Sequence, residues 1–300
     1  MKKKIYISGC GGMLGEAFYN LFKDEYNLKC TDINVNEEWI SYLDFRNYKI
    51  YYDDVINYNP DYLFHLGAYT DLEFCENNKN ETYLTNTISV ENATFIANDL
   101  KIPLLYISTA GIFDGKLEEY DDWSQPNPIG HYAKTKYFAE KFVINNCHQS
   151  LICRAGWMMG GGLKKDKKFI KKIINQLIDG KKELYVVNDK LGTPTYTYDF
   201  ANNIKYLIQN NIWGLFNMVC EGVTGRFEVT KEILSILNFS NIKLNSVDSN
   251  YFKDEYFVER PYSERLINKK LNLRKANKMR DWKLCLKEYI DSEFKNIINK

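Results

Sequence analysis

Residues 4–15 read Lys-Ile-Tyr-Ile-Ser-Gly-Cys-Gly-Gly-Met-Leu-Gly. The first five predict a buried β-strand, and apolar residues recur at helical spacing from 14 to 22. Gly9, Gly12 and Gly15 therefore fall in a turn between a strand and a helix. Glycine there permits a tight turn and lets a pyrophosphate approach backbone N–H groups at the helix N-terminus. The pattern predicts a dinucleotide site to which Met13 and Leu14, at the opening of the helix, also contribute.

The same alternation of short apolar runs and helical patterns continues along the first half of the chain. Further strands are predicted at 27–31, 61–66, 103–108 and 150–154, separated by stretches that include a long helix over 81–99. Strands that alternate with helices indicate right-handed βαβ units. The predicted fold is α/β, a Rossmann-type, doubly wound parallel sheet.

The regular alternation of strands and helices ends after about residue 157. A run of three glycines at 160–162 predicts a loop, and helices are expected over about 166–179 and 228–237. We predict a dinucleotide-binding domain over 1–157, to which 194–222 return. Residues 158–193 and 223–300 are predicted to form a smaller C-terminal substrate-binding lobe.

Composition argues against nucleic-acid, membrane and metal partners and predicts a protein of the cytoplasm. Forty basic and 39 acidic residues leave a net charge of +1, so no global field attracts nucleic acid or an anionic membrane. The longest basic run, 164–172, is interpreted as a solvated helix face. No window approaches the roughly 18 apolar residues of a membrane span. Seven scattered cysteines without a C-x-x-C pair, and only three histidines, give no support to a metal site.

Tyr132 and Lys136 are four residues apart, so on a helix they share one face. A tyrosine hydroxyl has a reference pKa near 10, and a neighbouring ammonium is expected to lower it towards the working range. In a chain with 23 tyrosines this spacing also arises by chance. Ser108 and Thr109 favour the catalytic interpretation, because they end a predicted strand where a hydroxyl can hydrogen-bond a reacting carbonyl. Thr109, Tyr132 and Lys136 are the predicted catalytic residues, and Lys136 also reaches the nicotinamide ribose.

Asp32 stands at the end of the second predicted strand, where an acidic group can bind both hydroxyls of an adenosine ribose. Its carboxylate would repel a 2′-phosphate. The cofactor is therefore NAD or NADP, with NADH favoured over NADPH. The alternative is an Asp that only caps a turn.

At this point the chain resembles, nearly end to end, an extended short-chain dehydrogenase/reductase of the dTDP-4-dehydrorhamnose reductase family. The resemblance rests on six segments: His65-Leu66-Gly67-Ala68-Tyr69-Thr70, Tyr106 to Gly115, Tyr132 to Lys136 with Glu140, Arg154-Ala155-Gly156-Trp157, Gly192-Thr193-Pro194-Thr195, and Arg260-Pro261 near Trp282. It implies an NAD(P)H-dependent reductase of a nucleotide-linked 4-keto-6-deoxy sugar, in the synthesis of surface polysaccharides.

The resemblance also assigns roles to individual residues. It places Asp44 and Phe45 near the adenine and Asn86 on a helix behind the active site. The loop from Gly67 through Ala68 and Tyr69 to Thr70 lines the cofactor and substrate cleft. The substrate side is assigned Thr70, Ser108, Ala110, Trp157 and Arg260.

One segment departs from the family. Where its members read Ser-Thr-Asp-Tyr-Val-Phe-Asp-Gly, this chain has Ala110 and Gly111 in place of the Asp and Tyr. The chemistry is expected to survive, whereas the sugar is expected to differ from dTDP-4-dehydro-L-rhamnose. The vacated room would admit another sugar, or Tyr69 or Trp157 would turn in to fill it. The alternative is that the loop moves and the usual sugar still fits.

Two other functions stay open. One is an epimerase or dehydratase that retains its NAD. The other is a non-catalytic nucleotide-binding regulatory subunit, since the family resembles the regulatory subunit of methionine adenosyltransferase. His65 lies within an apolar strand and is interpreted as a packed core residue rather than an acid or base. The oligomeric state is also open, with a homodimer as one option.

Overall fold

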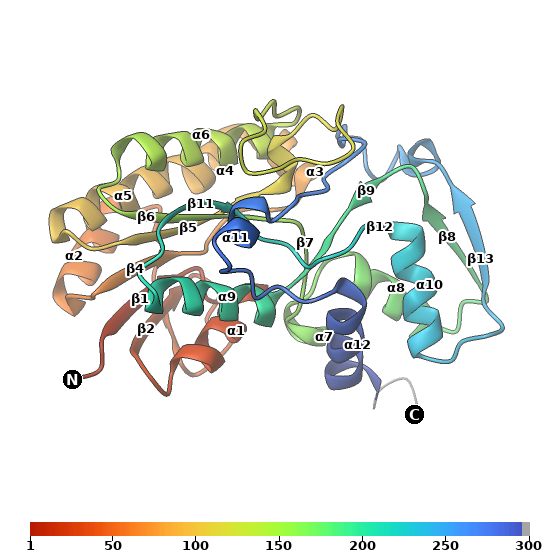
Figure 1. Ribbon diagram of the computed structural model, residues 1–300, viewed down its shortest axis with the longest axis horizontal. Helices are drawn as coiled ribbons and strands as arrows, with labels where there is room; N and C mark the ends of the chain where they lie inside the picture. Colours follow the sequence, from red (N-terminus) through yellow and green to blue (C-terminus); the bar gives the residue numbers. More distant parts are fainter. Residues whose placement is uncertain (296–300) are drawn as a thin grey trace.

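A seven-stranded parallel sheet forms the centre of the computed structural model, which describes residues 1–295 (Figure 1). Its strand order is β11-β6-β5-β4-β1-β2-β3, and all neighbours pair in parallel. The strands are β1 (Lys4–Ser8), β2 (Asn27–Asp32), β3 (Ile40–Tyr42), β4 (Tyr62–His65), β5 (Leu104–Thr109), β6 (Ser150–Ala155) and β11 (Gly214–Asn217). The predicted Rossmann-type α/β fold is confirmed. The strand order reverses between β1 and β4, where such sheets bind ligands beyond the carboxyl ends of the strands.

Helices cover both faces of this sheet (Figure 1). One face carries α2 (Tyr48–Tyr58), α5 (Ser89–Leu100) and α6 (His131–Asn146), and the other carries α1 (Met13–Phe22) and α9 (Thr197–Gln209). Side chains alternate along β1, so Ile5 and Ile7 join the core under α1 while Tyr6 joins the core under α5. Both faces are therefore buried, as parallel sheets require.

The structure differs from the predicted elements at two places. β3 was not predicted, because it is only three residues long and Ile40 alone is buried, which leaves no apolar run to detect. The long helix predicted over 81–99 is divided into α4 (Lys79–Tyr83), a π-helical turn η1 (Leu84–Ile88) and α5, and it follows α3 (Leu72–Asn77). A π-helical turn inside a longer helix often marks a functional site.

Shorter elements extend from one end of the sheet (Figure 1). Three two-stranded sheets are formed by β7 (Trp157–Met159) with β10 (Pro194–Tyr196), β9 (Leu191–Gly192) with β12 (Thr224–Gly225), and β8 (Glu183–Val187) with β13 (Lys243–Val247). The helices are α7 (Gly162–Lys165), α8 (Phe169–Ile178), α10 (Arg226–Ile236), α11 (Lys269–Leu273) and α12 (Trp282–Glu293), with 3₁₀ turns η2 (Ala110–Ile112) and η3 (Ser249–Phe252).

Two contacts place segments from beyond the predicted boundary at residue 157 against the main sheet. β11 pairs with β6 at the edge of the main sheet, and α11 packs against β11 although it lies within the predicted lobe. The boundaries at 157, 193 and 222 stay a prediction. Within residues 1–295, no helix combines the length and apolar character needed to cross a membrane.

Candidate active site

The turn between β1 and α1 is tightly packed. Gly9 has a φ of +85°, and a Cβ built on it would lie 2.2 Å from the backbone nitrogen of Gly67. A Cβ on Gly15 would lie 1.9 Å from the carbonyl oxygen of Cys10. Gly12 caps the ten-residue helix α1 without a side-chain hydrogen bond, so the first N–H groups of Met13 and Leu14 have no side-chain cap. This arrangement fits the pyrophosphate of a dinucleotide.

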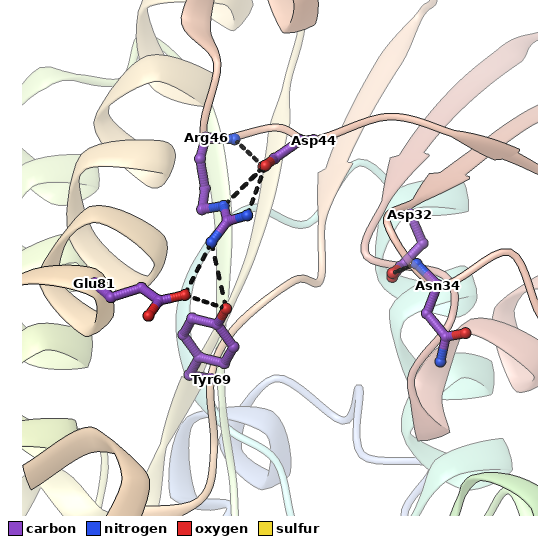
Figure 2. Close-up of polar contacts among 6 residues, drawn as sticks. All are labelled: Asp32, Asn34, Asp44, Arg46, Tyr69 and Glu81. Atoms are coloured by element: carbon purple, nitrogen blue, oxygen red, sulfur yellow. Dashed lines mark hydrogen bonds and ion pairs between the residues drawn. The ribbon is translucent and has the colours of Figure 1, made fainter. Parts of the chain in front are cut away.

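Asp32 ends β2 beside this turn, and its carboxylate binds two loop amides. The N–H of Gly11 donates to Oδ2 at 2.9 Å. The N–H of Asn34 donates to Oδ1 at 2.7 Å (Figure 2). Asp32 therefore does cap the turn, as the alternative interpretation expected. Each carboxylate oxygen has a further lone pair, so capping leaves room for ribose hydroxyls. The ribose role of Asp32 stays a prediction.

Helix α7 brings two lysines to the loop that follows Asp32. Lys164 Nζ lies 2.7 Å from Glu37 Oε1, and Lys165 Nζ lies 3.1 Å from the same oxygen. The side chain of Lys165 is only 1% exposed and its Nζ lies 5.3 Å from the centre of the Trp39 ring. The interpretation of the basic run as a solvated face is therefore wrong for Lys165, because packing against Trp39 and Glu37 buries it.

Asp44 and Tyr69 both accept hydrogen bonds from Arg46. The Arg46 guanidinium holds the Asp44 carboxylate through two nitrogens and lowers its pKa. Arg46 also donates to the Tyr69 hydroxyl at 3.3 Å, and that hydroxyl donates to Glu81 at 2.7 Å (Figure 2). The expectation that Tyr69 turns into the room left at 110–111 is not met, because these contacts hold its side chain.

Phe45 and His65 form the wall behind the glycine turn. A Cβ on Gly67 would lie 2.3 Å from the Phe45 ring, whose centre is 4.8 Å from that of His65. His65 is fully enclosed and hydrogen-bonds Ser8 and Ser89. Burial lowers its pKa to about 3, and the charge of Lys136 acts in the same direction. The interpretation of His65 as a packed core residue is confirmed.

The predicted catalytic residues come together at the ends of β5 and α6. Thr109 is the last residue of β5, while Tyr132 and Lys136 occupy the first turns of α6. Burial raises the pKa of Tyr132 above its usual range, and the nearby Thr109 hydroxyl opposes that rise. Lys136 is 4% exposed, with its Nζ 4.4 Å from the centre of the Tyr106 ring. Burial lowers the pKa of Lys136 to about 7, against the charge of Glu140.

The pKa of Tyr132 thus moves in the direction opposite to the expected one. The sequence predicted that Lys136 would lower it, but withdrawal of the phenol from water is the larger influence. The outcome favours a protonated phenol at neutral pH, the form that can donate a proton.

Asn86, from the π-helical turn, fixes the cleft loop to α6. Its amide oxygen accepts from the backbone N–H of Tyr69 at 2.8 Å, and its amide nitrogen donates to the Tyr69 carbonyl at 2.9 Å. The same nitrogen donates to the Thr135 hydroxyl at 3.3 Å. Asn86 therefore lies behind the catalytic helix and holds the segment that contains Gly67 and Ala68.

The predicted sugar side is built from three separate segments. The Trp157 indole N–H donates to Glu264 Oε2 at 2.8 Å. The guanidinium carbon of Arg226 lies 4.3 Å from the centre of the Trp157 ring and 4.8 Å from that of Phe169, and burial lowers the pKa of Arg226 to about 10. A Cβ on Gly192 would lie 2.3 Å from the Trp157 ring. The indole is therefore held in place rather than free to turn.

Glu264 is the residue at this end that sequence reasoning missed. A Cβ built on Gly111 would lie 3.3 Å from Glu264 Oε1 and 3.5 Å from Thr109 Oγ1. The carboxylate thus occupies the room beside Gly111 that Tyr69 or Trp157 was expected to fill. The available signal was its place four residues after Arg260, in a segment already assigned to the site.

Of the other residues predicted on the substrate side, two have polar partners for their side chains within the described part of the chain and two do not. Thr70 Oγ1 accepts from Lys168 Nζ at 2.9 Å, and Arg260 binds both carboxylate oxygens of Glu73 at 2.9 and 3.0 Å. The Ser108 hydroxyl is buried without a hydrogen-bond partner among residues 1–295. Ala110 is 1% exposed and belongs to a small apolar cluster, so no contact supports a substrate role for its side chain.

The Rossmann-type sheet, the glycine turn and the positions of Thr109, Tyr132 and Lys136 match the pattern of the short-chain dehydrogenase/reductase class. The family model of the RmlD substrate binding domain matches residues 2–294, and the chain belongs to that family. It is therefore an extended short-chain dehydrogenase/reductase similar to dTDP-4-dehydrorhamnose reductases, within a family of NAD(P)-dependent sugar-nucleotide reductases.

Individual relatives cover most of the chain. Spore coat polysaccharide biosynthesis protein SpsK of Bacillus subtilis (strain 168) is 25% identical over 289 residues, 96% of both proteins. The crystal structure of dTDP-4-dehydrorhamnose reductase from Bacillus anthracis str. Ames in complex with NADP is 28% identical, with a TM-score of 0.87 over 97% of this chain and 100% of that one. Methionine adenosyltransferase 2 subunit beta of Xenopus tropicalis is 23% identical over 254 residues, 82% of this chain and 75% of that protein.

Proposed function

We propose that this protein is an NAD(P)H-dependent reductase of a nucleotide-linked 4-keto-6-deoxy sugar that serves polysaccharide synthesis. The observation that carries the proposal is the placement of Thr109 at the carboxyl end of β5, with Tyr132 and buried Lys136 on the first turns of α6, which packs against β5. The uncapped N-terminus of α1 lies in the adjoining β1–α1 turn. A site with these parts can reduce a carbonyl group or oxidise an alcohol.

The residues present fit a dinucleotide. Gly9, Gly12, Met13 and Leu14 would hold the pyrophosphate and Asp32 the adenosine ribose, with Asp44, Phe45, Gly67, Ala68 and Tyr69 around them. When bound, the reduced nicotinamide supplies a hydride. Lys136 would hold the nicotinamide ribose, for which its buried ammonium is available because it forms no ion pair within residues 1–295.

The proton needed in the reduction comes from Tyr132. Because burial raises the pKa of its phenol, the hydroxyl keeps its proton at neutral pH until a carbonyl oxygen gains negative charge beside it. Thr109 orients the same oxygen through its hydroxyl group. Both side chains come from the ends of regular elements, so the geometry exists before the substrate binds.

Two alternatives make different predictions. An epimerase or dehydratase that retains its NAD would convert the sugar without net use of cofactor. A non-catalytic regulatory subunit is favoured by the similarity to the adenosyltransferase subunit. The complete set of Thr109, Tyr132 and Lys136 supports the enzyme, since a binding module gains nothing from a half-buried phenol and a buried ammonium.

A panel of nucleotide sugars that contains 4-hydroxy hexoses as well as 4-keto-6-deoxy sugars, among them dTDP-4-dehydro-L-rhamnose, separates these functions. The purified chain is mixed with each sugar and NADH or NADPH, and nicotinamide absorbance and sugar products are followed. Loss of absorbance with a 6-deoxy product supports the reductase, and sugar conversion at constant absorbance indicates a retained cofactor. No conversion of any sugar, with nucleotide binding intact, contradicts an enzyme. We expect dTDP-4-dehydro-L-rhamnose to be a poor substrate, with kcat/KM below about 10⁴ M⁻¹s⁻¹.

A further inference from the structure

Glu264 offers a free carboxylate oxygen close to the predicted reaction centre. Its Oε2 accepts from Trp157, while Oε1 accepts no hydrogen bond from any of residues 1–295. A Cβ on Gly111 would lie 3.3 Å from Oε1 and 3.5 Å from Thr109 Oγ1. Both oxygens therefore lie beside Gly111, so a ligand held by the Thr109 hydroxyl comes close to the Glu264 carboxylate.

The position of this carboxylate is set by the chain around it. The Glu264 N–H donates to the Leu191 carbonyl at 2.8 Å, and Leu191 and Ser263 form a β-bridge. A Cβ on Gly115 would lie 2.5 Å from the Tyr262 nitrogen, so the loop after β5 packs against the same segment. Trp157 in turn lies between Gly192 and Arg226. A group held by so many contacts loses little conformational freedom when it binds a ligand.

Gly111 and Glu264 are sterically complementary. At 3.3 Å, a Cβ at position 111 already crowds the carboxylate, so a tyrosine there would have to point away from Glu264 or displace its side chain. Replacement of Asp-Tyr by Ala110-Gly111 therefore does not leave the cleft empty. It exchanges one acceptor for another that comes from a different segment of the chain.

An ionised carboxylate can only accept hydrogen bonds, so its ligand must present a donor. In the proposed substrate the reacting keto carbon is C4, and its neighbours are C3 and C5. C5 bears the methyl group of a 6-deoxy sugar, which leaves C3 as the neighbour that carries a hydroxyl group. We propose that Glu264 determines substrate specificity by accepting a hydrogen bond from the C3 hydroxyl of the nucleotide sugar. This inference rests on the proposed function for the identity of the reacting carbon.

The test compares sugar nucleotides that have or lack the C3 hydroxyl. Affinities of the oxidised-cofactor complex for 6-deoxyhexose nucleotides and their 3-deoxy counterparts are measured by calorimetry, with wild type, Glu264→Ala and Glu264→Gln. Wild type should prefer the C3 hydroxyl by about tenfold or more, the size of a hydrogen bond to a charged group. Glu264→Ala should lose that preference, and Glu264→Gln, which keeps an acceptor and the Trp157 contact, should retain part of it.

Two control variants distinguish a direct hydrogen bond between Glu264 and the sugar from a purely structural role of Glu264. Glu259→Ala changes an exposed carboxylate on the same segment and should leave the preference intact. Gly111→Ala should reduce it by displacing Oε1. If Glu264→Ala weakens both sugars equally, Glu264 has only a structural role and the inference is overturned. Because affinity is measured without turnover, absence of reduction contradicts the proposed function alone. Absence of any C3 preference in wild type contradicts this inference alone.

Discussion

The catalytic end and the sugar end of this site are built in different ways. Thr109, Tyr132 and Lys136 lie on β5 and α6, two elements of the main sheet and its covering layer. Trp157, Arg226 and Glu264 come from three short segments outside that sheet and meet through one hydrogen bond and one stacked guanidinium. The proposed chemistry is thus assigned to regular elements of the main sheet and its covering layer, and the proposed recognition to segments whose residues can be exchanged without disturbing the sheet.

The largest expected effect is on stability and concerns the buried ion pair that joins α6 to the sheet. Arg154 on β6 holds Glu140 on α6 at 2.6 and 3.0 Å, with side chains 4% and 1% exposed. Glu140→Ala leaves a buried guanidinium unpaired, and we expect a loss of about 3–5 kcal/mol in the free energy of unfolding. Chemical denaturation measures it. The exposed ion pair of Lys49 and Asp53 is the control, since Asp53→Ala should cost below about 1 kcal/mol. Equal costs for the two variants would show that α6 is not anchored by this pair.

Removal of the proton donor tests the chemistry itself. Tyr132→Phe keeps the ring and removes the acid, so turnover should fall by at least about a hundredfold while cofactor affinity changes little. Tyr137→Phe, on the same helix, is the matched control and should keep its activity. Single-turnover rates and cofactor titrations provide the measurements. Turnover of Tyr132→Phe close to that of wild type would remove the acid role.

The dependence of kcat/KM on pH tests whether activity requires the charge of Lys136. Burial lowers its pKa to about 7, so the ammonium is present below that pH and is lost as the pH rises. If the charge is required, kcat/KM should fall by about tenfold for each pH unit above 7. Tyr132, with a raised pKa, stays protonated through this range. Lys136→Arg, whose charge persists, should lack the fall. A wild-type profile that stays flat well above neutral pH would contradict the assignment.

The two ends also differ in how far the sequence alone could predict them. β1, α1 and α6 were predicted because apolar spacing, glycines and the Tyr-x-x-x-Lys step are local signals. Glu264 was not, because its importance depends on meeting Gly111 from a distant segment. The burial of Lys165 and the raised pKa of Tyr132 were missed for the same physical reason. Both depend on what packs around a side chain, which neighbours in sequence do not specify.

The smallest expected effect lies at the adenosine end, where Asp32 combines a structural and a predicted recognition role. Asp32→Asn keeps an acceptor for a loop amide but removes the charge that faces a 2′-phosphate. One charge contact in a solvated site contributes about 1 kcal/mol, so the ratio of kcat/KM for NADH to that for NADPH should fall about fivefold. Asp24→Ala, an exposed carboxylate beyond α1, should leave the ratio unchanged. Lys164 approaches the same loop from α7, and Lys164→Ala should move the ratio in the opposite direction. If Asp32→Asn leaves the ratio unchanged and Lys164→Ala alters it, the preference between NADH and NADPH is set by segments outside the sheet, as we propose for the choice of sugar.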